Sequence, residues 1–420
     1  MAMLAPLSRA QTINGERKAA LAVGARAVCV RIHRYAGLAM AAFLTLAGLT
    51  GSVLAFNDEL DAWLNPNLYL AKKPGALLPP SDLAKAVEAI DPRVIAVWIP
   101  LKVAPGETAL VWVSTLHDPK TGEHYDVGFN QVFVEPSTGE ILGKRNWGAL
   151  SVTRENLIPF LYVLHYSLHV PGGVGLWIMG LIAIVWIFDC FIGAYLTFPR
   201  GRPFLAKWKP SWLVKFGASG HRVVYDMHRA LGLWLWGLLL AIAVSAVYLN
   251  LPDQVFRPVV GSIATLSSSP EEGREPRVGD VPAKISLEMA IARAAGEAAR
   301  RGWTEKPAFV GWDHDHGIFH VRYQAGQHRS AAGLGASTFY VADEDGRLLG
   351  KDVAGEGTPG DIFLQLQFPL HSGEIAGLTG RIVICGAGIF VAALSITGVL
   401  VWARKRRART LKLLTAGAQN

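Results

Sequence analysis

Two apolar stretches of the chain open with the same short pattern, His-Arg followed two residues later by Gly-Leu. The pattern stands at His33-Arg34-x-x-Gly37-Leu38 and again at His228-Arg229-x-x-Gly232-Leu233. Each copy begins a hydrophobic run long enough to cross a bilayer, where a histidine without a partner is costly. Two such histidines at matching places point to one shared partner. The pattern therefore favours a membrane fold that brings the two runs together.

The composition agrees with a membrane protein. Of 420 residues, 51% are hydrophobic, and the formal net charge is +8. Many of the basic residues stand beside apolar runs, where they act as topology signals, so the charge does not indicate binding to nucleic acid. No Cys-x-x-Cys-His is present among the three cysteines, which excludes covalent c-type haem attachment.

We predict an α-helical integral membrane protein with four transmembrane helices and two α+β domains outside the cytoplasm. The predicted spans are 28–56, 157–198, 223–249 and 371–403, and the second span has a break at Pro171-Gly172-Gly173. The soluble segments are 57–156 and 250–370. The basic segments 1–27, 199–222 and 404–420 are predicted to be cytoplasmic, which places both soluble segments in a bacterial periplasm.

Each soluble segment has the pattern of one amphipathic helix followed by strands. In the first segment we predict a helix over 81–90 and strands over 94–99, 109–115 and 131–134. In the second segment we predict a helix over 286–301 and strands over 308–312, 317–323 and 337–341.

Further matched strings indicate an internal duplication. Gly139–Lys144 (GEILGK) is echoed by Gly346–Lys351 (GRLLGK), and Leu168-His169 is echoed by Leu370-His371. The matches come in the same order as the His-Arg repeat. We therefore interpret the chain as two copies of one unit, at roughly 28–198 and 223–403.

The histidines near the span ends form two predicted layers, each with one member from each copy. His33 and His228 make the inner layer, and His371 makes the outer layer with either His165 or His169. Facing imidazoles in a helix bundle are suitable axial ligands for haem iron, so we predict two b-type haems separated by roughly 15–20 Å. The alternative for each histidine is a position at the membrane interface, either solvated or hydrogen-bonded to the backbone.

Three arginines are candidates for holding haem propionates. Arg34 and Arg229 directly follow the inner histidines, and the alternative for them is anchoring at the cytoplasmic interface. Arg381 lies inside the fourth span, so we expect it to face the bundle, near a propionate or an acidic partner. Asp189, deep in the second span, is also expected to point inward.

One further histidine group lies in the second soluble segment. His314, His316 and His320 would share one face of an extended strand and could contact a metal. The alternative is that 313–317 is an exposed hairpin turn, and the segment Lys120–His124 in the first copy is a similar turn.

The ordered set of motifs resembles the PepSY-associated transmembrane family, which includes ferric-siderophore reductases. The motifs are His33-Arg34-x-x-Gly37-Leu38, Leu164-His165-Tyr166-Ser167-Leu168, Asp226–Gly232, Leu370-His371-Ser372-Gly373 and Thr397–Trp402. The resemblance implies periplasmic α+β PepSY domains, a four-helix membrane core and, in the siderophore-reductase branch, two haems. It also favours His165 over His169 as the outer ligand, whereas the duplication favours His169.

From these features we predict an inner-membrane di-haem reductase that passes electrons across the membrane to a periplasmic ferric chelate such as a ferric siderophore. The chain has no Gly-rich nucleotide fingerprint, so the electron donor is predicted to be separate, a cytoplasmic flavoprotein or a quinol. The alternatives are a quinol-linked cytochrome with another acceptor, a membrane anchor whose PepSY domains bind a protease, and a metal-binding or transport accessory that uses His314 and His316.

Overall fold

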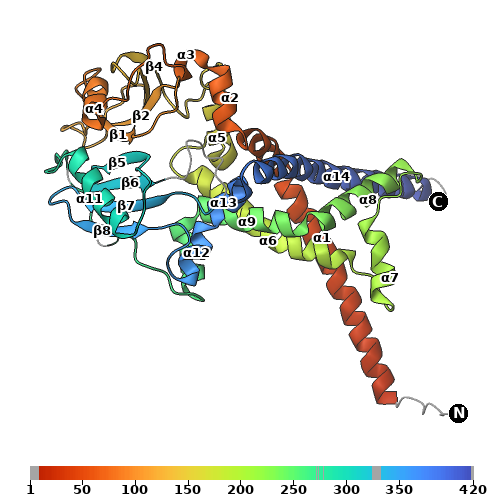
Figure 1. Cartoon of the computed structure of the whole chain (residues 1–420). Helices are drawn as coiled ribbons and strands as arrows, with labels where there is room; N and C mark the ends of the chain where they lie inside the picture. The colour runs from red at the N-terminus through yellow and green to blue at the C-terminus, as the bar shows by residue number, and fades with distance from the viewer. Residues whose placement is uncertain (1–8, 271, 273, 278, 324–332, 418–420) are drawn as a thin grey trace. The chain divides into compact units, whose positions relative to one another are not determined.

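The computed structural model describes residues 9–270, 272, 274–277, 279–323 and 333–417. The chain divides into two compact units (Figure 1). The helical unit contains Met1–Ser52, Leu176–Asn250 and Gly386–Asn420. The sheet unit contains Val53–Gly175 and Leu251–Cys385. Each unit is therefore built from both copies of the duplicated sequence.

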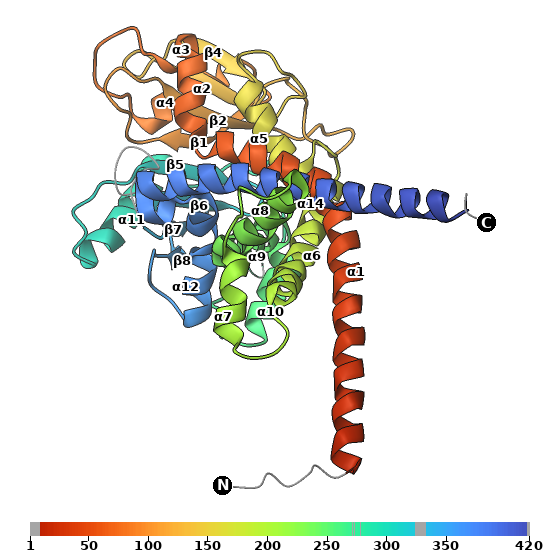
Figure 2. The same ribbon diagram turned by 90° about the vertical axis from the view of Figure 1, so that its right-hand side faces the viewer.

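The helical unit consists of long apolar helices. Its helices are α1 (Arg9–Leu54), α6 (Val174–Thr197), α8 (Gly220–Trp234), α9 (Trp236–Asn250) and α14 (Gly377–Gly417), and the basic loop forms α7 (Phe204–Trp208) and η1 (Lys209–Trp212). Within the described residues, three helices are long and apolar enough to cross a membrane, and the bent pair α8–α9 makes a fourth candidate. Figure 2 shows α1 as one uninterrupted helix that also includes part of the predicted N-terminal tail.

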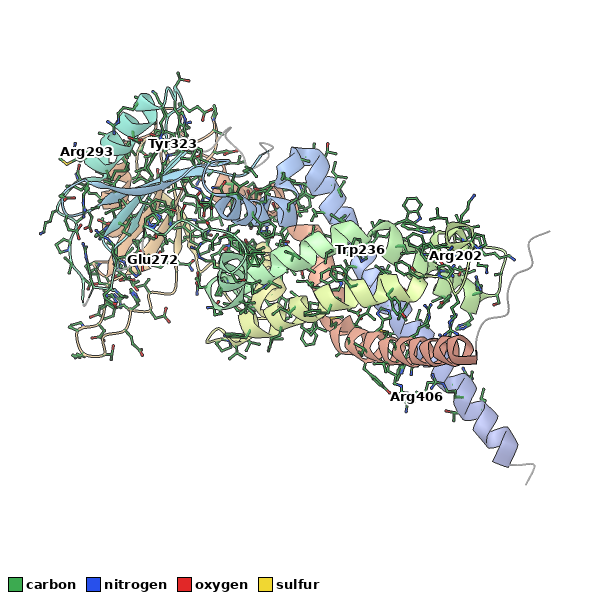
Figure 3. All side chains as sticks on the ribbon, turned by 90° about the horizontal axis from the view of Figure 1, so that it is seen from below. Arg202, Trp236, Glu272, Arg293, Tyr323 and Arg406 are labelled. Carbon is green, nitrogen blue, oxygen red and sulfur yellow. The ribbon has the colours of Figure 1, made fainter. Side chains whose placement is uncertain are left out.

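Two of the predicted spans are interrupted. The second span is broken between α5 (Leu157–Ser167) and α6, at the expected Pro-Gly-Gly turn. The third, predicted as one helix over 223–249, bends by 68° between α8 and α9. At this bend the indole of Trp236 donates a hydrogen bond to the carbonyl of Cys190 on α6, at 3.0 Å (Figure 3). Gly232 and Gly237 flank this bend, but a helical glycine allows a bend without requiring one, and we had predicted one continuous span.

Small residues bring α1 and α14 close together. A Cβ added to Gly48 would collide with the backbone carbonyl of Gly388, and one added to Gly388 would collide with that of Gly48. Because only glycine allows the two backbones to approach this closely, this pair determines where the first and last helices cross.

The sheet unit contains one antiparallel sheet of eight strands, in the order β4-β3-β2-β1-β5-β6-β7-β8. The strands are β1 (Val94–Pro100), β2 (Ala109–Thr115), β3 (Gln131–Val134), β4 (Ile141–Arg145), β5 (Phe309–Asp313), β6 (Ile318–Tyr323), β7 (Ser337–Ala342) and β8 (Leu348–Asp352). Helices α4 (Pro80–Glu88) and α11 (Leu287–Arg300) pack on the sheet and on each other. Their apolar faces, with Val87 and Ala294 fully buried, form the main core with the strands.

Short helices complete the sheet unit. They are α2 (Asn57–Leu64), α3 (Pro66–Tyr69), η2 (Pro252–Phe256), α10 (Arg257–Gly261), α12 (Pro359–Gln365), α13 (Gln367–Ser372) and η3 (Glu374–Ala376). Of these, α13 carries His371 in its last turn.

The two predicted α+β domains are halves of this single sheet. Strand β1 of the first half pairs with β5 of the second, with Trp98 opposite Gly311 and Ile99 opposite Val310. A Cβ on Gly311 would lie only 2.8 Å from the Trp98 ring, so the glycine makes room for the indole at the junction. Without this pairing β1 and β5 would be edge strands of two separate sheets, and joining the halves covers these two edges.

We did not predict strands β4 and β8 from the sequence, although they overlap the matched strings GEILGK and GRLLGK. Their central glycines lowered the apparent strand propensity. In the structure another segment lies against each glycine: a Cβ on Gly143 would meet the end of the Leu68 side chain, and one on Gly350 would lie 2.9 Å from Cγ of Pro270. In both copies the matched string therefore forms a strand whose central glycine is covered by another segment of the chain.

Candidate functional site

The helical unit brings the two repeated histidines together. His33 on α1 and His228 on α8 have ring centroids 6.1 Å apart. The Nδ1 atom of His33 lies 2.9 Å from Oδ1 of Asp189 on α6. The Nδ1 atom of His228 lies 3.0 Å from the carbonyl oxygen of Leu394 on α14. Each ring is thus held by the second long helix of its own copy.

These contacts determine which ring nitrogen remains available. A carbonyl oxygen only accepts hydrogen bonds, so Nδ1 of His228 carries the proton and donates it to Leu394. An ionised Asp189 imposes the same tautomer on His33. In both imidazoles Nε2 then keeps its lone pair, which is the arrangement of a metal-binding histidine whose other nitrogen is oriented by an acceptor.

Glycines on the facing helices make space for both rings. A Cβ on Gly193 of α6 would lie 3.4 Å from Cε1 of His33, and one on Gly398 of α14 would lie 3.1 Å from Cε1 of His228. Asp189 precedes Gly193 by four residues, just as Leu394 precedes Gly398. In each copy, one turn of the facing helix therefore provides both the acceptor for Nδ1 and the space for the imidazole ring. The two copies thus share the same local arrangement.

A second histidine pair lies in the sheet unit. His165 stands in the last turn of α5 and His371 in the last turn of α13. Their ring centroids are also 6.1 Å apart, with the ring planes at 70°. The two pairs are thus built separately, one in each unit, with the same spacing.

His169, the other candidate for the outer position, is engaged elsewhere. It lies beyond the end of α5 with a left-handed backbone, φ 55°. Its Nε2 lies 2.8 Å from the carbonyl oxygen of Phe160, and its ring stacks on the Phe160 ring at 4.6 Å. The sequence match of Leu168-His169 with Leu370-His371 therefore does not pair residues at equivalent positions in the fold. By place at a helix end, His165 is the counterpart of His371.

The spacing of both pairs suits a metal between two imidazoles. An imidazole nitrogen binds iron at about 2 Å and its ring centre lies about 1 Å further out, so two rings on opposite sides of one iron have centroids about 6 Å apart. The observed spacing of 6.1 Å in each pair matches this value. Each pair is therefore spaced widely enough for one iron between its rings, and the two haems stay a prediction.

The comparison with protein families gives one match, to the model described as the PepSY-associated TM region, over residues 30–405. The chain belongs to the PepSY-associated transmembrane family. Together with the apolar helices, this match identifies a membrane protein. No curated protein matches the chain. The family match covers all four histidines of the two pairs, since His33 is the first of them and His371 the last.

Two of the candidate arginines have protein partners. Arg229 donates to Asp226 at 2.9 Å and to the carbonyl of Pro210 at 2.7 Å. Arg381, 7% exposed, donates to Glu59 at 2.6 Å and to the carbonyl of Ala55 at 2.7 Å.

The expectation that Arg381 faces inward is confirmed, with Glu59 as its acidic partner. Arg229 is held by Asp226, which is 1% exposed and also pairs with Arg222. Arg34 is half-buried, and its role in binding a propionate stays a prediction.

Sequence reasoning placed Asp189 inward but did not identify it as the partner of His33. It missed Gly193 and gave Gly398 no role beyond its place in the Thr397–Trp402 motif. A signal existed, since each glycine lies near the predicted cytoplasmic end of the second long helix of its copy and is followed by apolar residues. Its meaning depends on which residue the glycine faces, and only the packed helices provide that information.

His314 and His316 of the predicted 313–317 turn, and His320 beyond it, separate in the structure. Nδ1 of His316 pairs with Asp313 at 2.8 Å, and the His320 ring packs between those of Trp98 and Tyr340. His314 is buried and faces His117 and His124 of the first half. Burial lowers the pKa of His314, and the two neighbouring imidazoles lower it further against the raising effect of Asp315.

Proposed function

We propose that this protein is an inner-membrane reductase with two b-type haems, which passes electrons across the membrane to a periplasmic ferric chelate such as a ferric siderophore. Reduction releases the metal because ferrous iron binds such chelators far less tightly. The electron donor is separate, either a cytoplasmic flavoprotein or a quinol. Family membership supports the membrane setting, and the histidine pairs support the cofactor.

The observation that carries the proposal is the equal spacing of the two pairs. His33 with His228, and His165 with His371, each bring one imidazole from each copy of the sequence to 6.1 Å. Other packed rings have similar separations, such as His117 and His314 at 6.0 Å. The support therefore lies in the repetition, because two separate pairs each join one histidine from each copy at a distance that leaves room for one iron.

Each residue of the inner site has a defined task. His33 and His228 would supply Nε2 as ligands, while Asp189 and the Leu394 carbonyl hold the opposite nitrogens and orient the rings. A haem held there would supply one-electron chemistry between its ferric and ferrous states. No covalent intermediate with the protein is required, because the protein supplies cofactor position and potential.

The distribution of charge supports the orientation. Basic residues gather at the N-terminal segment, in the 200–222 loop and after Trp402. By the positive-inside rule these segments are cytoplasmic, so the sheet unit is in the periplasm and His165 and His371 lie at the periplasmic side. Electrons then enter at the His33–His228 site and leave at the His165–His371 site.

The decisive test is the haem content of the detergent-purified full chain, measured by the pyridine haemochrome method with and without dithionite. The wild type should contain about two b-type haems per chain, and His33→Ala and His371→Ala should each retain about one. The matched control is His221→Ala, which removes an exposed histidine of α8 and should retain both. A colourless protein produced with ample porphyrin supply would contradict the proposal.

The acceptor is tested separately by mixing the dithionite-reduced protein anaerobically with ferric siderophore, ferric citrate or a quinone analogue. Rapid reoxidation by the ferric chelates alone supports the reductase. Reoxidation by the quinone analogue alone would support the two haems but would replace the ferric chelate with a quinone as the proposed acceptor.

A further inference from the structure

A group of three histidines gathers where the two halves of the sheet meet. Strands β2 and β5 both pair antiparallel with β1, on opposite sides of it, so they run in the same direction. Their carboxyl ends therefore flank the beginning of β1. His117 follows β2 by two residues, and His314 follows β5 directly. His124 joins them because it forms an antiparallel bridge with His117.

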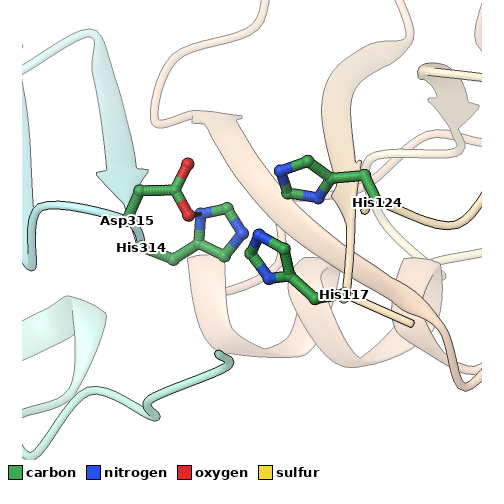
Figure 4. Close-up of side chains that lie close together, drawn as sticks. All are labelled: His117, His124, His314 and Asp315. Atoms are coloured by element: carbon green, nitrogen blue, oxygen red, sulfur yellow. Dashed lines mark ion pairs between the residues drawn. The ribbon is translucent and has the colours of Figure 1, made fainter. Parts of the chain in front are cut away.

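The side chains at this place are close enough to share one ion. One possible ligand atom from each of His117, His124, His314 and Asp315 lies within 4.8 Å of all the others (Figure 4). In a tetrahedral site with bonds of about 2.0–2.2 Å, the ligand atoms are about 3.3–3.6 Å apart. The four atoms would need to close by little more than an ångström, which rotation of the exposed His124 ring and the half-buried Asp315 carboxylate can provide.

The hydrogen bonds leave one nitrogen of each ring for a ligand. Nδ1 of His124 lies 2.6 Å from the carbonyl oxygen of Thr115, so it must donate, and Nε2 keeps its lone pair. Nδ1 of His117 lies 2.8 Å from Oδ1 of Asp280. The buried Nε2 of His314 has no hydrogen-bond partner in the part of the chain that the structure describes.

Asp280 has the features of a supporting residue for such a site. Its carboxylate accepts from Nδ1 of His117 at 2.8 Å and also from the His117 backbone N–H, at 3.0 Å to Oδ2. Both contacts fix the His117 ring with Nε2 directed away from the carboxylate. A carboxylate that orients a ligating histidine in this way recurs in zinc sites.

From this geometry we infer that His117, His124, His314 and Asp315 form a site for a single divalent transition-metal ion of the zinc class. Three imidazole nitrogens with one carboxylate oxygen are a donor set for zinc and its borderline neighbours, and not for Ca²⁺ or Mg²⁺, which take oxygen ligands. The bound ion would link the loops of the two halves across the β1–β5 junction. The site is independent of the proposed haems, because it uses none of their ligands.

The test uses the detergent-purified full chain, treated with EDTA and dialysed. Zinc is titrated against a competing chelator at pH 7.5, and bound metal is quantified by mass spectrometry. The wild type should bind one zinc per chain at this site. His117→Ala and His124→Ala should each weaken binding by on the order of 100-fold, and Asp280→Asn by roughly 10-fold.

The control variants separate this site from other histidines. His316→Ala removes a neighbouring imidazole that pairs with Asp313, and His221→Ala removes an exposed histidine of α8, so both should bind zinc as the wild type does. Circular dichroism verifies folding, and exposed His124 offers a substitution that leaves the core intact. Zinc binding that is unchanged in His117→Ala and His124→Ala, or lost in His221→Ala, overturns the inference.

Discussion

The two histidine pairs have the same spacing, but they are built in different ways. In the inner pair, His33 and His228 lie within long helices, and each Nδ1 is held by an acceptor on a neighbouring long helix. In the outer pair, His165 and His371 stand in the last turns of short helices that end in left-handed residues, Leu168 at φ 57° and Gly373 at φ 82°.

The difference indicates what each pair depends on. The inner spacing follows from helix packing, with Gly193 and Gly398 making space for the rings. The outer spacing follows from where two helices end, because a shift by one residue would turn either ring by about 100° around its helix. We therefore expect substitutions in the long helices to affect only the inner pair, and changes at the helix ends to affect only the outer pair.

The largest effect is expected from Gly398→Leu. A Cβ at this position already lies 3.1 Å from Cε1 of His228, so a leucine displaces the imidazole. Haem content should fall from about two to about one per chain, with the remaining haem lost when His371→Ala is added. Gly386→Leu on the same helix is the control, because a Cβ there meets nothing within 4 Å. Retention of both haems in Gly398→Leu would show that the inner pair does not depend on this gap.

A smaller effect is expected from Asp189→Asn, which makes the His33 side resemble the His228 side, where a neutral carbonyl is the acceptor. An ionised carboxylate on Nδ1 stabilises the more positive ferric state, so its loss should raise the potential of one haem. A change of about 1–1.5 kcal/mol corresponds to roughly 40–65 mV for one electron. Spectroscopic redox titration measures the shift, and the second haem is the internal control. A shift of both haems, or of neither, contradicts the assignment.

The smallest effect is expected from His169→Ala. The variant loses a hydrogen bond to the Phe160 carbonyl and a ring stack, which should cost about 1 kcal/mol of stability and leave haem content unchanged. His165→Ala should instead lose one haem. Thermal unfolding and the haemochrome assay measure the two outcomes. If His169→Ala lost the haem and His165→Ala kept it, His169 and not His165 would be the outer ligand.

Much of the secondary structure could be predicted from local patterns. The strands over 109–115 and 131–134 have the predicted bounds, and the predicted helix over 286–301 differs from α11 by one residue at each end. The pattern failed where a glycine serves a tertiary contact, as in β4 and β8. It also failed at the bend between Gly232 and Gly237, because a helical glycine allows a bend without requiring one.

The sequence by itself determined the membrane character, the duplication and the candidate histidines, because hydropathy, repeats and residue type are local properties. Only the tertiary structure decided that the two soluble halves share one sheet through Trp98 and Gly311. It also decided that His165 and not His169 lies beside His371, and that His117 and His124 meet His314. These facts depend on where strands pair and where helices end, which are set by contacts between residues far apart in the chain.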